Sequence, residues 1–205
     1  MITTSRKKRP LDRSNAVRDA VLVVVATEGA ITEGIYFSLF ESTRVQVKVV
    51  PTSGGKSSPD HVYDRLKQYQ RDYELGDGDE LWLAIDKDRW THRSLSTIAS
   101  RCHRESIGLA LSNPCFEIWL AMHFPSSETF PEIMTSKEAE ALLKGRFPGY
   151  SKSKFDVHQL SVGKENAITV ARSLDAGSRA RWPNKTGSRM YKLVESIERK
   201  FAPGS

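Results

Sequence analysis

The feature that most constrains the fold is an apolar, mostly β-branched run at residues 21–26, which breaks at Glu28-Gly29. Consecutive apolar residues are typical of a strand that is covered on both faces, and helical spacing of apolar residues begins at Ile31. A strand, a tight turn and a helix in this order is how an open α/β sheet presents a functional loop. Glu28 follows the strand directly, so it is a candidate site residue rather than a core residue.

The chain repeats this alternation up to about residue 124. A further helix is expected to open at Asn113-Pro114, with Asn113 as its cap and the proline near its first turn. Strands that alternate with helices predict a Rossmann-like α/β fold with a mostly parallel, four-stranded sheet flanked by helices. The other expected strands lie at 45–50, 81–85 and 108–111, and the other expected helices begin at 31, 59 and 92.

The pattern changes after Pro125, where loops rich in Gly, Ser, Pro and Lys join three expected helices near 136–144, 163–174 and 188–201. We therefore expect three parts. They are a flexible basic arm (1–14), an α/β core (15–125) and a basic, mainly helical extension packed on that core (126–205).

Composition favours a globular protein without a membrane segment. The chain is 39% hydrophobic and 27% charged, and no apolar run approaches the roughly 20 residues of a membrane helix. Cys102 and Cys115 form no CxxC or Cys/His metal pattern. We expect a cytoplasmic, reducing location.

Positive charge is concentrated at the back of the chain. Residues 135–205 carry 14 Lys and Arg against 7 Asp and Glu, whereas residues 1–134 carry 17 against 18. Basic residues interspersed with aromatic ones suit a surface that tracks RNA or single-stranded DNA, although a solvated face of a helical cap accounts for the charge equally well. The candidate nucleic-acid contacts are Lys152, Lys154, Arg179, Arg181, Lys185 and Arg189, and the aromatics among them are Phe147, Tyr150, Phe155 and Trp182.

Carboxylates follow two of the expected strands, Glu28 after the first and Asp86 and Asp88 after the third. Because carboxyl ends of neighbouring parallel strands meet in one crevice, we expect these groups to converge. Hard oxygen ligands without Cys or His clustering select Mg²⁺ or Mn²⁺. Glu28, Asp86 and Asp88 are the candidate catalytic and metal-binding residues. Glu117 either completes a second metal site or hydrogen-bonds backbone nearby.

Two lysines are candidate supports for a phosphate. Lys56 lies in a Gly-Gly-Lys-Ser segment that lacks the earlier glycine of a phosphate-binding P-loop, because Val50 occupies that position. A flexible loop that ends in a helix cap is the favoured interpretation, with Lys56 free to approach a phosphate. Lys87 stands between the two aspartates; its alternative is an ordinary surface charge.

These motifs resemble two known groups. VVATEG (24–29) followed by IDKD (85–88) is similar to the Toprim domain of topoisomerases, primases and several nucleases. More closely, TEGAITEGIYF (27–37), the two aspartates and SNPCFEIWLAMHF (112–124) resemble the RloB family.

The resemblance implies a Toprim fold, with Glu28 as general acid/base and Asp86 and Asp88 as metal ligands. It includes Glu33, Glu117 and His123 in the more local RloB-like pattern. It also implies a metal-dependent nuclease that acts on RNA, including tRNA, or on DNA, as effector of an anti-phage, abortive-infection system. Its partners would be nucleic acid and a neighbouring ATPase, and a homo-oligomer is left open. The alternatives are a non-catalytic regulatory or binding subunit and, third, a nucleotidyl-transfer enzyme.

Overall fold

The computed structural model describes residues 20–40, 42, 44–52, 54, 57–126 and 129–201. The expected basic arm (1–14) and Lys56 lie outside these residues. Among the described helices, none is both long and apolar enough to cross a membrane.

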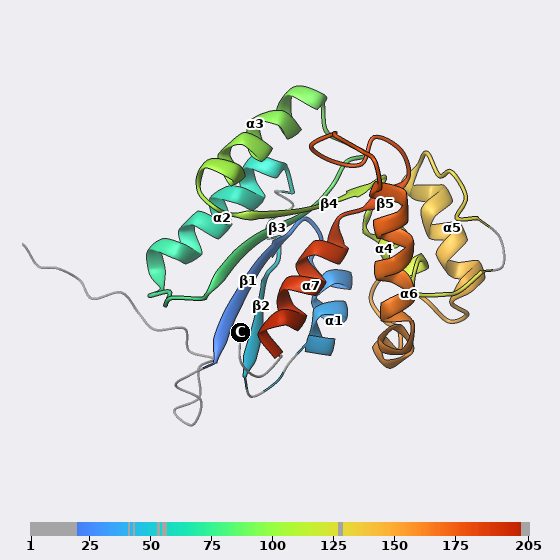
Figure 1. The fold of residues 1–205 in the computed structure, drawn as a ribbon, viewed down its shortest axis with the longest axis horizontal. Helices are drawn as coiled ribbons and strands as arrows, with labels where there is room; N and C mark the ends of the chain where they lie inside the picture. Colours follow the sequence, from blue (N-terminus) through green and yellow to red (C-terminus); the bar gives the residue numbers. More distant parts are fainter. Residues whose placement is uncertain are drawn as a thin grey trace, which may run out of the picture.

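One five-stranded sheet with the order β2-β1-β3-β4-β5 forms the centre of the protein (Figure 1). The first four strands are parallel, as the alternating pattern predicts. The fifth pairs antiparallel with β4 through only two residues, so a four-stranded sheet was wrong by one strand. The strands are β1 (Val21–Thr27), β2 (Val45–Val50), β3 (Glu80–Asp86), β4 (Gly108–Asn113) and β5 (Gly187–Ser188).

Helices cover both faces of the sheet. In Figure 1, α2 (Pro59–Asp72) and α3 (His92–Arg104) lie on one face. The opposite face is covered by α1, α4 and the three helices that follow residue 125. The bounds on that side are α1 (Thr32–Phe37) with a 3₁₀ turn (Ser38–Phe40), α4 (Phe116–Ala121), α5 (Ser136–Arg146), α6 (Val157–Asp175) and α7 (Met190–Phe201).

The first strand explains the continuous apolar run. Val23 and Val25 belong to the core on the α1 side, whereas Leu22 and Val24 belong to the core on the α2 side. Alternate side chains of a strand point to opposite faces, so a strand covered twice needs an apolar residue at every position. The burial of both faces of β1 therefore explains the continuous apolar run from which this strand was predicted.

The core on the α1 side joins both halves of the chain. It contains Trp119 of α4 together with Leu143 of α5, Ala167 of α6 and Leu193 of α7, all of them fully buried. Helices from residues 126–205 thus supply apolar side chains to the same buried cluster as the strands.

The start of α4 differs from the prediction. The helix begins at Phe116, with Cys115 at its N-cap position, so Asn113 is not its cap. The amide of Asn113 instead donates to the carbonyl oxygens of Pro183 (3.1 Å) and Lys185 (2.7 Å). Asn113 therefore fixes the segment that leads into β5, a long-range role that the local cap pattern could not reveal.

Candidate active site

The candidate site lies where β1 and β3 end. The Glu28 N–H donates to the Ala84 carbonyl at 3.1 Å, which extends the pairing of β1 with β3 by one residue. Oε2 of Glu28 then accepts hydrogen bonds from the Asp86 N–H (3.2 Å) and from Nε1 of Trp90 (3.1 Å). The Glu28 carboxylate is therefore held directly beside the backbone that carries Asp86.

The loop after β3 is fixed to the end of β4. The Lys87 N–H donates to Ser112 and Pro114 carbonyls at 2.9 and 3.1 Å, and the Asp88 N–H donates to Pro114 at 3.1 Å. The Asp88 carboxylate accepts from the hydroxyl of Ser136, at the start of α5. Backbone contacts thus position the Asp-Lys-Asp segment independently of any ion.

Glu33 joins the site from α1. Its Oε1 accepts from the Gly29 N–H at 2.9 Å. A Cβ at position 29 would stand 2.3 Å from Oε2 of Glu33. Gly29 therefore provides both the donor and the space that the Glu33 carboxylate occupies, which explains a glycine directly after Glu28.

These groups surround one cavity of about 180 Å³. Glu28, Glu33, Asp86, Asp88 and Glu117 all line it, from four different parts of the chain. The convergence expected for Glu28, Asp86, Asp88 and Glu117 is what the structure shows. Glu33, which only the family resemblance suggested, lies among them.

Burial and the neighbouring negative charges make three carboxylates of this cavity, those of Glu28, Glu33 and Asp86, harder to ionise, which raises their pKa. Burial raises the pKa of Glu28 and of Glu33, and the hydrogen bonds from Trp90 and Asp86 partly offset this for Glu28. The pKa of Asp86 is raised well above its ordinary value, first by burial and then by the charges of Glu28, Glu33, Glu117 and Asp88. Crowded, partly desolvated carboxylates of this kind are stabilised by a cation.

The donor chemistry fits a hard divalent ion. Carboxylate oxygens are the ligands that Mg²⁺ and Mn²⁺ prefer, and no described residue donates a hydrogen bond to the Asp86 side chain. Within the described part of the chain, however, no three His, Cys, Asp or Glu side chains already stand at the spacing of a metal site. Coordination therefore requires some of these carboxylates to rotate.

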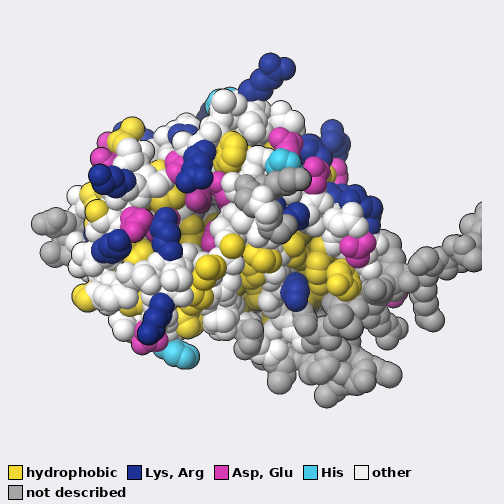
Figure 2. Space-filling view, turned by 180° about the vertical axis from the view of Figure 1, so that it is seen from behind, with side chains coloured by type: hydrophobic (Ala, Val, Ile, Leu, Met, Phe, Trp, Pro, Cys, Tyr) yellow, Lys and Arg dark blue, Asp and Glu magenta, His cyan; other side chains and the backbone are white. Residues whose placement is uncertain are grey.

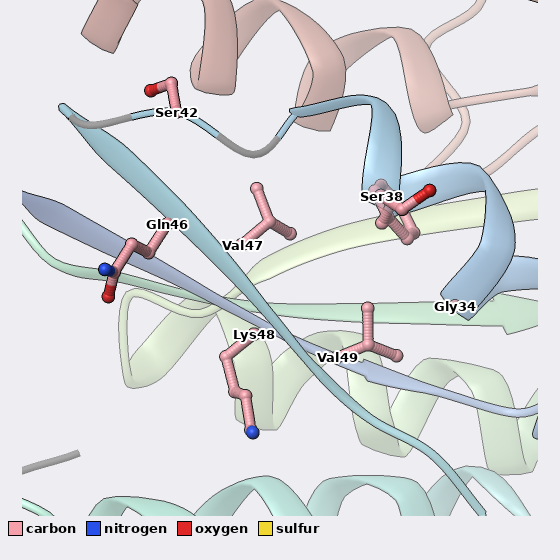
Figure 3. A pocket seen from close by; sticks show the side chains of 8 residues that line it. Gly34, Ser38, Ser42, Gln46, Val47, Lys48 and Val49 are labelled. Carbon is pink, nitrogen blue, oxygen red and sulfur yellow. The ribbon is translucent and has the colours of Figure 1, made fainter. Parts of the chain in front are cut away.

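A larger cavity of about 530 Å³ lies beside the edge strand β2. Figure 3 shows Val47 and Val49 of that strand and Gly34 and Ser38 of the α1 region around it. Among the described residues, its lining includes Lys48 but no carboxylate. Acid–base or metal chemistry needs ionisable groups that converge. The cavity of about 180 Å³ has them, so it is the candidate site.

Two of the expected supporting residues lie elsewhere. Nζ of Lys87 donates to the Asn184 carbonyl at 3.2 Å, and Lys87 does not line the cavity. His123 is buried between Tyr36 and Trp119. Its Nδ1 is 2.9 Å from the Trp119 carbonyl, which can only accept, so Nε2 is left to accept from the Tyr36 hydroxyl at 3.3 Å. His123 is a neutral core residue.

The six residues that were expected to contact nucleic acid lie in different environments. Lys154, Arg179 and Lys185 are exposed. Arg181 donates to the hydroxyls of Ser96 and Ser100 at 3.0 Å. Lys152 forms an ion pair with Glu117, which lines the acidic cavity, at 3.0 Å.

Arg189, the sixth expected nucleic-acid contact, is largely buried. Its side chain is only 11% exposed and forms an ion pair with Asp175 at 2.9 Å. Its guanidinium also donates to the carbonyl oxygens of Ala180 and Arg181. Five hydrogen bonds from this guanidinium fix the loop before β5, which is a structural role.

The interspersed aromatics are core rather than stacking surfaces. Phe147, Tyr150 and Trp182 are buried, and Phe155 is partly buried against Phe147 and Tyr150. On the face shown in Figure 2, Lys and Arg side chains are interspersed with Asp and Glu and do not gather into one basic patch. The basic-aromatic pattern therefore reflects a helical layer packed on the sheet.

Sequence reasoning missed several residues at the site. Trp90 and Ser136 bind the carboxylates of Glu28 and Asp88, and the buried thiol of Cys115 lines the cavity. The Thr-x-x-Glu capping box at Thr135 predicts where α5 begins, but not that this end of α5 meets Asp88. Trp90 lies two residues after Asp88. Its indole N–H can only donate a hydrogen bond, and this was the sequence signal that it could bind a carboxylate.

Comparison with known proteins identifies one family. A family model described as "RloB-like protein" matches residues 23–197. The matched range includes every carboxylate of the cavity. No curated protein matches this chain, and no solved structure matches it.

Proposed function

This chain belongs to the RloB-like family, and on that premise we propose that it is a Mg²⁺- or Mn²⁺-dependent nuclease of the Toprim type. The observation that carries the proposal is the convergence of five carboxylates on one cavity at the carboxyl ends of parallel strands. A protein gains nothing in stability from such crowding. Function is the better explanation for it.

Glu28, Asp86 and Asp88 would hold the metal ion. When bound, a divalent ion neutralises a scissile phosphate and lowers the pKa of a water molecule. Glu28 is suited to proton transfer, because burial raises its pKa while Trp90 and the Asp86 N–H hold its carboxylate in place. Arg89 lines the cavity with a side chain that is 71% exposed, so it can reach a phosphate oxygen.

The wider setting of the proposal follows the family resemblance. The substrate is RNA, including tRNA, or DNA, and the protein acts as effector of an anti-phage system together with an ATPase. Exposed cations at Lys154, Arg179 and Lys185 are available to a polyanion.

One observation favours a second function, that of a non-catalytic regulatory or binding subunit. Four of the five carboxylates already have partners in the protein: Trp90 and the Asp86 N–H for Glu28, Gly29 for Glu33, Ser136 for Asp88 and Lys152 for Glu117. A crevice whose carboxylates are already paired within the protein can bind a partner without catalysing a reaction.

Cleavage assays separate the two functions. Purified protein, alone and with the ATPase encoded beside it, is incubated with labelled tRNA, single-stranded DNA and duplex DNA in Mg²⁺ or Mn²⁺. We expect Glu28→Gln and Asp86→Asn to abolish cleavage, whereas Glu165→Gln, at an exposed carboxylate of α6, retains it. Cleavage that survives in both site variants would overturn the mechanism. Intact substrates under every condition would favour the non-catalytic subunit.

A further inference from the structure

A tight turn in the C-terminal half contacts Thr32 and Glu117, two of the residues that line the acidic cavity. Ser151 and Lys154 exchange backbone hydrogen bonds, each of 3.0 Å, so that Lys152 stands within a two-residue loop. Tyr150, just before the turn, is buried. The Thr32 hydroxyl of α1 donates to the Lys152 carbonyl at 2.8 Å. The backbone of Lys152 is thus held both within its own turn and by the helix that carries Glu33.

The ammonium of Lys152 forms an ion pair with Glu117, one of the residues that line the cavity. Its Nζ lies 3.0 Å from Oε1 of Glu117 and 3.5 Å from Oε2 of Glu140. Glu117 is only 7% exposed, whereas the Lys152 side chain is 58% exposed. A buried carboxylate therefore receives its counter-charge from an ammonium whose remaining surface is open to solvent and to a ligand.

This contact divides the acidic centre into two parts. Glu117 is neutralised by Lys152, while no described residue donates a hydrogen bond to the Asp86 side chain. A second divalent ion on Glu117 would have to share its oxygen with the ammonium, and the two cations would repel at such short range. On the side of Glu28, Asp86 and Asp88, the ion pair found among the described residues is the longer one between Arg89 and Asp88, at 3.9 Å, and the Arg89 side chain is 71% exposed.

We propose that the centre binds a single divalent ion, on the Glu28–Asp86–Asp88 side, and that Lys152 supplies the second positive charge. Held by Glu117, the Lys152 ammonium occupies the position of a second metal and faces a phosphate oxygen of the substrate. This inference rests on the proposed function and assigns Glu117 as the residue that positions Lys152. It places one residue of the C-terminal half inside the reaction centre.

Metal stoichiometry tests the inference without a substrate. Full-length protein is titrated with Mn²⁺, and free Mn²⁺ is measured by electron paramagnetic resonance. We expect one bound ion per wild-type chain. Lys152→Met should bind two, because the substitution frees Glu117, and Lys152→Arg should again bind one. Lys154→Met serves as the matched control for stoichiometry, since it removes a lysine from the same turn, and it should bind one ion.

The outcomes distinguish the inference from the function on which it rests. Two ions on the wild-type protein, or one ion on Lys152→Met, would overturn the role of Lys152 and leave a metal-dependent nuclease standing. No bound Mn²⁺ on the wild-type protein would overturn both. Lys152 is largely exposed, so Lys152→Met should still unfold in one cooperative transition, and bound Mn²⁺ should raise its Tm as it raises that of the wild-type protein.

Discussion

The Glu28 carboxylate accepts a hydrogen bond from the Asp86 N–H at 3.2 Å, across 58 residues of sequence. The end of β1 and the end of β3 are therefore joined by a site residue rather than by backbone pairing alone. This bond holds the Glu28 carboxylate beside the main chain of Asp86. The two negative side chains repel each other, and this repulsion lowers the stability of the folded protein when both are ionised.

Asp86→Asn should stabilise the metal-free protein. The folded pKa of Asp86 is raised, so the ionised carboxylate destabilises the fold at pH values above its unfolded pKa. Removing that charge should add about 0.5–2 kcal/mol to the free energy of unfolding. Urea unfolding in EDTA at pH 7.5 measures this change. Mn²⁺ should stabilise the wild-type protein but not the variant; a variant less stable than wild type in EDTA would contradict the prediction.

Trp90→Phe should move the acidic limb of the pH–rate profile to higher pH. The indole N–H favours the ionised form of Glu28, so its loss raises the pKa of the base further. A hydrogen bond to a charged group is worth about 1.5–3 kcal/mol, so its loss should move the limb clearly. The profile of kcat/KM for cleavage measures it.

Trp82→Phe is the matched control for that profile. Trp82 makes the same kind of bond, from Nε1 to Oε2 of Glu80 at 2.8 Å, but it does not line the cavity. The Trp82→Phe profile should coincide with that of the wild-type protein. Equal shifts in both variants would indicate a general loss of structure instead of an effect on Glu28.

Gly163→Ala should destabilise the protein strongly. Gly163 lies within α6, and a Cβ there would stand 1.8 Å from the carbonyl oxygen of His123. Relieving this overlap requires backbone movement, and we expect a loss of about 3 kcal/mol or more. In Gly145→Ala, on α5, the added Cβ meets nothing within 4 Å, so a gain of up to about 1 kcal/mol is expected from helix propensity. Urea unfolding of both variants checks the contrast.

His123 should make the protein lose stability as the pH falls from 6.5 toward 4. Burial lowers the pKa of His123 to about 4, so between these values the unfolded chain binds a proton that the folded chain does not. This term contributes about 1.4 kcal/mol per pH unit in that window. Urea unfolding from pH 4.5 to 7 should give a steeper slope for the wild-type protein than for His123→Gln, which cannot titrate there. Equal slopes would contradict the assignment.

Much of the sheet could be predicted because burial dictates its sequence. A strand such as β2, expected at 45–50, has those bounds in the structure, since apolar periodicity reports burial directly. The grouping of Glu28 with Asp86 could be predicted because ends of parallel strands must meet. The two-residue β5 has no periodicity to read and depends on the contact of Ser188 with Ser112.

Contacts between distant loops lay beyond the sequence. Nothing in the residues around Lys152 indicates that its ammonium meets Glu117, because the contact depends on how a turn packs against α1. Tyr150 and Trp182 illustrate a different difficulty. Aromatics interspersed with basic residues are typical of a nucleic-acid surface, but the same spacing occurs where aromatics pack beneath a charged exterior, and here they are buried.

The hydrogen bond from Thr32 to the Lys152 carbonyl also bears on the order of events during synthesis. All five carboxylates of the cavity precede Lys152 in the chain, so Glu117 leaves the ribosome before its counter-charge does. Until residue 152 has emerged and its turn has docked on α1, the centre lacks the ammonium that neutralises Glu117. A nascent chain thus carries the acidic residues of the cavity before it can form the ion pair between Lys152 and Glu117.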